Sequence, residues 1–268
     1  MSTLFEPSGV ITVTTDFGHR GPFVGTMKGV ILSRFPSATI VDLTHEAYVH
    51  WPAEAGFWIA RSYHYFPLGT VHLAVVDPGV GTDRNVLLAF GAGHAFLAPD
   101  NGLLAEAIDR SNADVFHLSG TIIDACRLED VSATFHGRDI FAPLAAAIAS
   151  GALSRDDLGE PTLDYIPSII EPAERRGAQF VGVVITSDHF GNLITNVTRE
   201  DLDGFKEPVV KAGGHDIDFG RTYGDVSPGD LIALINSFGV LEIARAEQNA
   251  AEFLGIGRGA PIRVVEKV

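Results

Sequence analysis

The feature that most constrains the fold is an alternation of apolar strands and amphipathic helices near the start of the sequence. Residues 10–15, 39–43 and 71–76 are short β-branched or apolar runs, which are typical of buried strands. Residues 23–35 and 52–65, which separate these runs, have the pattern of helices. Because crossover helices pack on the faces of a sheet, this order predicts a parallel sheet flanked by helices.

The second half of the sequence follows a different pattern. Residues 85–90 and 94–97 predict two further strands of the first domain, and residues 100–109 and 138–150 predict two further helices. Beyond them, short apolar runs alternate with turn residues, as in small β-barrels. These runs are residues 180–186, 193–197, 208–212, 230–236, 240–244 and 261–265, and one short helix is expected near residues 249–254.

The sequence therefore predicts an α/β protein of two domains. An N-terminal α/β domain with a largely parallel sheet is expected at residues 1–165, and a smaller C-terminal all-β, barrel-like domain at residues 179–268. Prolines, charges and a glycine between them predict a linker at residues 166–178.

Composition argues against several classes of protein. The 268 residues include 19 Lys and Arg but 34 Asp and Glu, for a formal net charge of −15. Nucleic acids and anionic membranes bind basic surfaces, so we expect neither as a partner. No apolar run is long enough for a membrane-spanning helix. The single cysteine, Cys126, and the lack of a signal-peptide pattern predict a cytoplasmic protein without disulfides.

Polar residues follow three of the predicted strands. Asp16 follows the first, residues 42–45 end the second, and Asp77 follows the third. Ligands of open α/β sheets bind beyond the carboxyl ends of the strands, so these residues predict one edge of a site. Asp16 could accept two hydrogen bonds from a vicinal diol, such as that of a ribose. A helix N-cap or an Asx-turn is the structural alternative.

Two further candidates lie in loops of the first domain. Asp77 precedes a Pro-Gly turn and Arg84 follows seven residues later, so the two can form a pair that is either catalytic or a structural salt bridge. His136, just before a predicted helix, is either a chemical group or a capping residue. Two other histidines, His45 and His50, are five residues apart and would not share a helix face, which argues against a zinc-protease site. We therefore expect no metal site.

The second domain contributes candidates for binding a purine. Phe190 could stack on a base, and Asn192 could form hydrogen bonds with it. Asn249 opens the expected short helix, where backbone amides are free. β-turns and a helix N-cap would explain the same residues without a ligand.

Taken in order, these motifs resemble the S-adenosyl-L-methionine (SAM) hydroxide adenosyltransferases, which are adenosine-forming SAM hydrolases related to the fluorinase and chlorinase. The resemblance runs from about residue 10 to the C-terminus. Its strings are TTDFG (14–18), VDLTHE (41–46), VVDPGVGTDR (75–84), FLAPDNGLL (96–104), TFHGRDIFAPLAA (134–146), DHFGNLITN (188–196), NSFGVLEIA (236–244) and NAAEFLG (249–255).

The resemblance implies that SAM is the substrate, that adenosine and L-methionine are the products, and that no cofactor is needed. It also implies a homotrimer whose active sites lie between the first domain of one subunit and the second domain of its neighbour. The family's catalytic triad corresponds to Asp77, Arg84 and His136 in this sequence. The implied substrate-binding residues are Asp16 for the ribose, Phe190, Asn192, Asn249 and Ala250 for adenine, Asp188 and Ser237 for the methionine end, Trp51 as an aromatic wall, and Tyr223 and Glu242.

In the implied reaction, a water or hydroxide attacks the ribose C5′ and the sulfonium sulfur leaves. Arg84 cannot act as the base, because a guanidinium does not lose its proton in proteins, so it would favour hydroxide by its charge. Asp77 would accept the hydrogen bond or the proton of the water, and His136 would orient the water or relay the proton.

Two departures bear on this interpretation. Halogenating relatives have an aromatic residue in place of Asp77 and a tyrosine in place of His136, so the sequence favours the hydrolases. Gln248 stands before Asn249 where the family pattern has an arginine, so this sequence departs from the family next to the residues expected to contact adenine. The alternatives are a halogenase that forms a 5′-halo-adenosine, a non-catalytic SAM or adenosine sensor, and a metal-dependent hydrolase.

Overall fold

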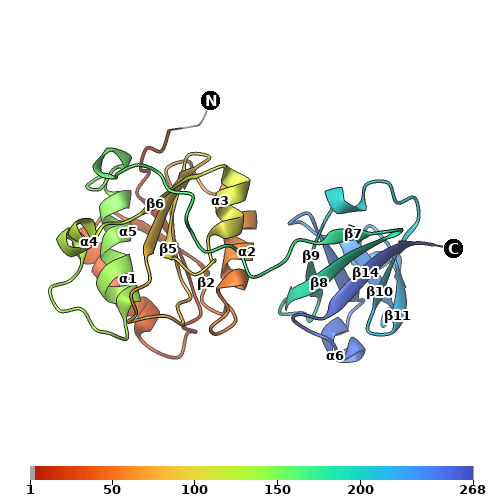
Figure 1. Ribbon diagram of the computed structural model, residues 1–268. Coiled ribbons are helices and arrows are strands. Elements are labelled where there is room, and N and C mark those ends of the chain that lie inside the picture. Colours follow the sequence, from red (N-terminus) through yellow and green to blue (C-terminus); the bar gives the residue numbers. More distant parts are fainter. Residues whose placement is uncertain (1–3, 268) are drawn as a thin grey trace. The chain divides into compact units, whose positions relative to one another are not determined.

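The computed structural model describes residues 4–267 and consists of two compact units (Figure 1), with the division between Ile170 and Glu171. The first unit is an α/β domain, and the second is built from antiparallel strands with one short α-helix. The α/β class expected from the sequence is thus confirmed. The division falls within the segment for which the sequence predicts a linker.

The first unit contains a six-stranded, largely parallel sheet with the order β2-β1-β3-β5-β4-β6. The pairs β1–β2, β1–β3 and β3–β5 are parallel, whereas β4 runs antiparallel to both β5 and β6. The strands are β1 (Val10–Thr15), β2 (Thr39–Thr44), β3 (Val71–Val75), β4 (Val86–Gly91), β5 (His94–Pro99) and β6 (Asp114–His117).

Helices cover both faces of this sheet because successive side chains of a strand point to opposite faces. Leu73 of β3 belongs to the core that contains Met27 and Ile31 of one helix, whereas the next residue, Ala74, belongs to the core that contains Ile59 of another. The first core includes α1 (Phe23–Arg34) and α5 (Ala142–Ala149), and the second includes α2 (Pro52–Ser62) and α3 (Ala105–Ser111). Shorter elements are η1 (Tyr63–Tyr65), α4 (Gly120–Cys126), η2 (Gly137–Phe141) and η3 (Arg155–Asp157).

The sequence missed or misplaced several short elements. Strand β6 has only four residues with polar ends, and α4 has only seven, so neither has a clear periodicity. The helix expected at residues 100–109 starts at Ala105, after a turn in which Gly102 has a φ of +85°. The helix expected at residues 138–150 begins with the π-helical turn η2.

The second unit is a nearly closed, barrel-like sheet of antiparallel strands in the order β11-β10-β14-β8-β9-β13-β12, with β7 paired to β8. A parallel bridge between Phe219 and Ala233 joins the two ends, supported by a 2.9 Å hydrogen bond from Gly220 N to Ala233 O. The strands are β7 (Glu174–Arg176), β8 (Gln179–Ser187), β9 (Leu193–Thr198), β10 (Pro208–Ala212), β11 (His215–Asp218), β12 (Leu231–Ile235), β13 (Val240–Arg245) and β14 (Pro261–Glu266). The short helices are η4 (Glu200–Leu202), η5 (Tyr223–Asp225) and α6 (Ala250–Leu254).

The barrel interior is filled by apolar side chains that alternate along the strands. Leu193, Val210, Leu241 and Ile262 are fully buried in one cluster. Strand β11, which the sequence analysis missed, contributes only Ile217 to this cluster and has the polar neighbours of an edge strand.

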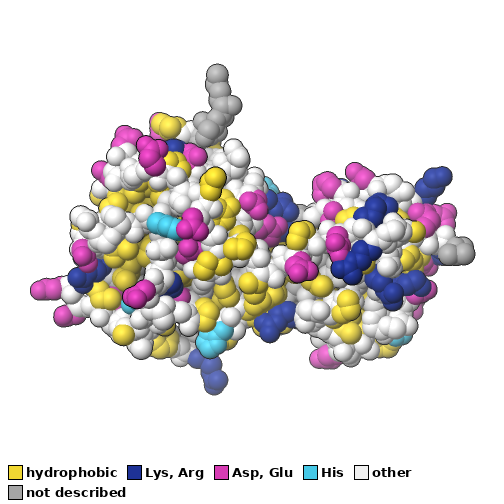
Figure 2. Space-filling model, in the orientation of Figure 1, with side chains coloured by type: hydrophobic (Ala, Val, Ile, Leu, Met, Phe, Trp, Pro, Cys, Tyr) yellow, Lys and Arg dark blue, Asp and Glu magenta, His cyan; other side chains and the backbone are white. Residues whose placement is uncertain are grey.

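Acidic side chains are dispersed over the face of both units that Figure 2 shows, as expected from the net charge of −15. Among residues 4–267, no helix is long and apolar enough to cross a membrane.

Two histidines are buried in the sheet of the first unit, away from the strand ends that carry Asp16 and Asp77. The Nδ1 atom of His72 lies 2.8 Å from Thr12 Oγ1, and its Nε2 atom lies 3.2 Å from His94 Nδ1. Burial, and then the neighbouring His94, lower the pKa of His72 to about 3. Burial also lowers the pKa of His94. Both rings are therefore neutral at pH 7 and resist protonation.

This pair predicts that acid destabilises the first unit. The folded pKa of His72 lies below that of the unfolded chain, so stability is present above about pH 6.5 and is lost as the pH falls. We expect the free energy of unfolding to drop by about 2 kcal/mol between pH 7 and pH 5 from His72 alone. Denaturant titrations that follow Trp51 and Trp58, both in the first unit, measure this directly.

His72→Leu should reduce that pH dependence by about the same amount. The control is Thr12→Val, which removes the hydroxyl partner but leaves His72 buried and titratable, so the pH dependence should persist. An unchanged slope in His72→Leu would show that another group is responsible.

Candidate active site

Asp77 and Arg84 form a buried ion pair beyond the carboxyl end of β3. The guanidinium Nε atom donates to both carboxylate oxygens of Asp77, at 2.8 and 2.7 Å, and Nη2 also donates to Oδ2. Only 4% of the Asp77 side chain and 10% of the Arg84 side chain are exposed. A buried charge needs a partner with good geometry, and this pair satisfies that requirement.

The same guanidinium brings His136 into the cluster. Arg84 Nη2 lies 3.2 Å from His136 Nδ1, and an arginine can only donate, so Nδ1 is the acceptor. Burial, followed by the Arg84 charge, lowers the pKa of His136, and Asp77 and Asp139 offset this only in part. At neutral pH the ring is therefore uncharged, with its proton on Nε2.

Close backbone packing holds these two loops together. Gly81 has a φ of +80°, and a Cβ atom there would lie 2.4 Å from the carbonyl oxygen of Ala133, so the loop after β3 can approach the loop before His136 only with glycine at this position. Behind the cluster, the Arg84 guanidinium faces the ring of Phe141, 5.4 Å from its centroid. Phe141 ends the π-helical turn that follows His136, and such turns are frequent at functional sites.

Asp16 lies at the carboxyl end of the adjacent strand, β1. Its Oδ2 atom accepts a 2.9 Å hydrogen bond from the backbone N of His50. The next residue, Phe17, packs edge-on against Phe23 and Phe135, with its ring centroid 5.9 Å from that of Phe135. Because Phe135 precedes His136, this aromatic contact brings the Asp16 loop next to the triad loop. The candidate Trp51 caps α2, in the loop that also contains His50.

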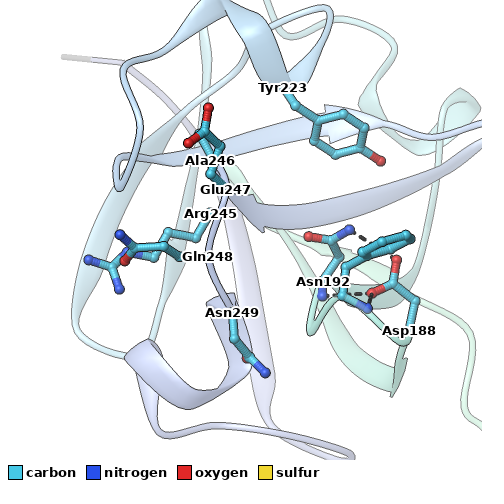
Figure 3. A pocket seen from close by; sticks show the side chains of 9 residues that line it. Asp188, Asn192, Tyr223, Arg245, Ala246, Glu247, Gln248 and Asn249 are labelled. Atoms are coloured by element: carbon cyan, nitrogen blue, oxygen red, sulfur yellow. Dashed lines mark hydrogen bonds between the residues drawn. The ribbon is translucent and has the colours of Figure 1, made fainter.

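The second unit contains a separate cavity of about 560 Å³. Figure 3 shows Asp188 and Asn192 on one side, Asn249 on the other, and Tyr223 above Asp188 and Asn192. The cavity is lined by Asp188, Phe190, Asn192, Tyr223, Arg245, Ala246, Glu247, Gln248 and Asn249.

On one wall of this cavity, Asp188 organises the turn that presents Phe190. Its Oδ1 accepts hydrogen bonds from the backbone N atoms of Phe190 and Asn192, each 2.9 Å long. Asn192 Nδ2 donates to Asp188 Oδ2, also at 2.9 Å, which leaves the amide oxygen of Asn192 as a hydrogen-bond acceptor. The Phe190 side chain is 74% exposed, so its ring is free to cover a planar ligand.

On the other wall, Asn249 acts as the N-cap of α6. Its Oδ1 atom accepts a 2.8 Å hydrogen bond from Glu252 N, so the side chain can offer its Nδ2 amide to a ligand. Gly191 has a φ of +83°, and a Cβ there would lie 2.2 Å from Asn249 Cγ. The two walls of the cavity are therefore in contact at Gly191, where a larger residue would not fit. The candidate Ala250 is the first, fully buried residue of α6.

A buried carboxylate lies behind Tyr223. The Tyr223 hydroxyl donates to Glu242 Oε1 at 2.7 Å, and Asn236 Nδ2 donates to Oε2 at 3.1 Å. Burial raises the pKa of Glu242, although these two hydrogen bonds act in the opposite direction. Burial and the same contact raise the pKa of Tyr223. Ser237 lies exposed in the turn between β12 and β13.

The structure thus places the candidate residues in two groups. Asp16, Asp77, Arg84 and His136 lie at the carboxyl edge of the first sheet, while the candidates of the second unit lie in or beside its cavity. Sequence reasoning missed Arg245, which lines the cavity and stacks on Phe253 at 3.8 Å from the ring centroid. No sequence motif indicated Arg245, because its position in the cavity depends on its contact with Phe253 of α6. Among residues 4–267, no group of three or more His, Cys, Asp or Glu side chains could hold a metal ion.

Comparison with known families now identifies the chain. The model of the SAM hydroxide adenosyltransferase N-terminal domain matches residues 11–159, and that of the C-terminal domain matches residues 182–263. This chain is a member of the SAM hydroxide adenosyltransferase family. The residues of both groups described above fall within these matched ranges.

Relatives of this family member align over nearly its whole length. An (R)-S-adenosyl-L-methionine hydrolase from Thermus thermophilus is 36% identical and covers 94% of this chain and 97% of its own. A fluorinase from an Actinoplanes species is 29% identical and covers 88% of this chain and 90% of its own. The crystal structure of an uncharacterized conserved protein from Thermotoga maritima has a TM-score of 0.87 at 32% identity, covering 96% of this chain and 100% of that chain.

The triad geometry predicts the protonation state of His136. Nuclear magnetic resonance of ¹⁵N-labelled histidine should show a neutral ring protonated on Nε2 at pH 7, because Nδ1 accepts from Arg84. Arg84→Gln should raise the pKa of His136, since it removes a positive charge and leaves Asp77 unpaired. The signal of His94, which contacts neither residue, should titrate as in the wild type. A proton on Nδ1, or a His136 pKa that does not rise, would contradict the arrangement.

Proposed function

We propose that this protein hydrolyses SAM to adenosine and L-methionine. The observation that carries the proposal is the buried Asp77–Arg84 pair, whose guanidinium also binds a neutral His136 at the carboxyl edge of the sheet. Membership in the family and the hydrolase relatives point to the same substrate. The attacking oxygen comes from water, the C5′–S bond breaks, and its electron pair stays on sulfur.

The triad supplies what a weak nucleophile needs. Arg84 Nη1 has no hydrogen-bond partner among residues 4–267, so it can donate to a water oxygen. The positive charge of Arg84 lowers the pKa of the bound water and favours hydroxide. Because Asp77 and His136 hold the guanidinium in place, its free N–H also fixes the direction in which the water lone pair points.

The proton of the water goes to Asp77. His136 Nδ1 is occupied by Arg84, and Nε2 already carries a proton, so the ring is not a base in this arrangement. Within the described part of the chain, Asp77 Oδ1 accepts one hydrogen bond, from Arg84 Nε, and keeps a lone pair for the proton. The balance is then one proton on Asp77, a new C5′–O bond, and a neutral thioether.

The leaving group requires neither a general acid nor a cofactor. A sulfonium sulfur becomes neutral as it departs, and the charges of hydroxide and sulfonium cancel in the transition state, which a site that excludes water favours. We therefore propose that the reaction is metal-independent. With a single cysteine and no disulfide framework, the cytoplasm is the compartment that we propose.

Each of the remaining candidate residues binds one part of the substrate. Asp16 binds the ribose diol, and Trp51 forms an apolar wall near it. Phe190 stacks on adenine, the Asn192 oxygen accepts from its amino group, and Asn249 Nδ2 with the Ala250 backbone donates to its ring nitrogens. The carboxylates of Asp188 and Glu242, with the hydroxyls of Ser237 and Tyr223, hold the methionine end.

We propose a homotrimer in which each active site combines the first unit of one subunit with the second unit of its neighbour. Each unit by itself carries only part of the required groups: the triad and the diol acceptor in one, the purine cavity in the other. Phe190, mostly exposed in the second unit, is suited to cover a ligand that another surface holds.

Isotope labelling tests the reaction. The protein is incubated in ¹⁸O-water with each sulfonium epimer of SAM, because the Thermus relative is named for the (R) epimer. We expect adenosine with ¹⁸O at its 5′-hydroxyl, and unlabelled methionine, with the same rate in the presence of a strong chelator. Label elsewhere, a chelator-sensitive rate, or binding without turnover would overturn the proposal. Adding fluoride or chloride and finding a 5′-halo-adenosine would instead indicate a halogenase.

The variant Arg84→Gln tests the role of this arginine in the same assay. It should lower kcat by about 10²–10³-fold, the usual effect of removing one preorganised donor, with a much smaller change in KM. An unchanged kcat would exclude Arg84 from the chemistry.

Complementation tests the shared site. Arg84→Gln affects only the first unit, and the double variant Phe190→Ala/Asn249→Ser affects only the purine cavity, since serine keeps the N-cap of α6. Subunits of the two inactive variants, unfolded together and reassembled, should recover about a quarter of the wild-type sites if a site uses two subunits. The particle mass should be three times 28.6 kDa. No recovery would show that each subunit builds its own site.

A further inference from the structure

A chain of polar groups begins at Thr15, the residue before Asp16, and neither the triad nor the substrate contacts proposed above use it. Thr15 Oγ1 lies 2.8 Å from His45 Nδ1, and His45 Nε2 lies 3.0 Å from Asp42 Oδ1. Lys28 Nζ donates to Asp42 Oδ2 at 2.6 Å. Thr15 and His45 are both buried, with at most 1% of their surfaces exposed.

Lys28 and His45 both face the Asp42 carboxylate at the far end of this chain. Burial alone would raise the pKa of Asp42, but the contacts with Lys28 and His45 hold it below its ordinary value. His45 turns its Nε2 atom toward this carboxylate and shares a hydrogen bond with the Thr15 hydroxyl through Nδ1. The Thr15 oxygen in turn accepts from the backbone N of Phe17, at 3.3 Å.

These bonds fix the backbone on both sides of Asp16. Thr15 precedes it, and Phe17, whose N–H is bound by Thr15, follows it, so the Asp16 backbone is held in a short turn closed by a hydroxyl. The loop after β2 adds two further bonds, from Gly18 N to the His45 carbonyl at 2.8 Å and from His50 N to Asp16 Oδ2 at 2.9 Å. An aspartate side chain has few rotatable bonds, so its backbone largely sets where the carboxylate points.

We propose that Thr15 and His45 are positioning residues that aim the Asp16 carboxylate and thereby set the selectivity of the site for a nucleoside with both ribose hydroxyls. This rests on the proposed function, because it requires Asp16 to bind the diol. A carboxylate recognises two adjacent hydroxyls only when both of its oxygens face them, so a small rotation costs one of the two hydrogen bonds.

The neighbouring residue Thr14 offers a matched control. It is also fully buried on β1, but its hydroxyl has no hydrogen-bond partner among the described residues. Thr15→Val and Thr14→Val therefore make the same chemical change one residue apart, and only the first breaks the chain to His45. Thr15→Ser retains the hydroxyl and should restore its effect.

The test compares the binding of adenosine and 2′,3′-dideoxyadenosine to the full-length protein by titration calorimetry. We expect the wild type to prefer adenosine by about tenfold or more, as hydrogen bonds to a carboxylate imply. Thr15→Val should reduce this preference by at least about threefold, through weaker adenosine binding at unchanged dideoxyadenosine binding. Thr15→Ser and Thr14→Val should keep the wild-type preference.

The outcomes distinguish a failure of this inference from a failure of the proposed function. If Thr15→Val keeps the preference, or weakens both ligands equally, the residue is merely structural and the inference is wrong, while the proposed function stands. If the wild type binds both nucleosides equally, Asp16 does not recognise the ribose hydroxyls and the inference also fails. A wild type that binds neither nucleoside contradicts the proposed function itself. If Thr15→Val does not fold, His45→Phe removes the same hydrogen bond and the same criteria apply.

Discussion

The buried contact between Arg84 and Asp77 is the interaction on which the rest of the site depends. A guanidinium that is only 10% exposed needs an anionic partner, and losing one member of such a pair typically costs about 3–5 kcal/mol. The pair also fixes the orientation of the guanidinium, so that Nη2 reaches His136 while Nη1 remains available. Because the arginine can only donate, it determines the tautomer of the histidine as well. This one ion pair thus sets the charge of the cluster, the orientation of the Arg84 guanidinium and the tautomer of His136.

Loop geometry makes this contact possible. Gly81 lets the loop after β3 approach the backbone at Ala133, and the aromatic contact between Phe17 and Phe135 joins the Asp16 loop to the same region. In the second unit, Gly191 allows the turn that carries Phe190 to touch Asn249. In both units, a glycine with positive φ stands where two functional segments meet, because a Cβ atom would separate them. The regular strands then provide a rigid base from which these loops project.

Much of the fold could be predicted from local sequence patterns. The β-branched or apolar runs of β1 and β3 and the helical pattern of α2 indicate these elements, and the switch to short strands marks the second unit. Short elements with polar ends, such as β6 and β11, could not be found, because their pairing partners rather than their own residues define them. The sequence pattern over residues 138–150 predicts ordinary helix and does not reveal the π-helical turn at Gly137–Phe141, since both kinds of helix have apolar residues at similar spacing.

The sequence by itself determined the residue types of the site and their order along the chain, because strand ends and turn motifs mark Asp16, Asp77 and His136 as candidates whatever their partners. It left open whether Asp77 and Arg84 meet, and which ring nitrogen of His136 carries the proton. Only the tertiary structure decided these points: the path of the loop after β3 brings Arg84 to Asp77, and Arg84 and His136, 52 residues apart in sequence, lie within hydrogen-bond distance. The same holds for the Thr15–His45–Asp42 chain next to Asp16, because Thr15 is on β1, Asp42 is on β2 and His45 follows β2, and the two strands pair only in the folded sheet.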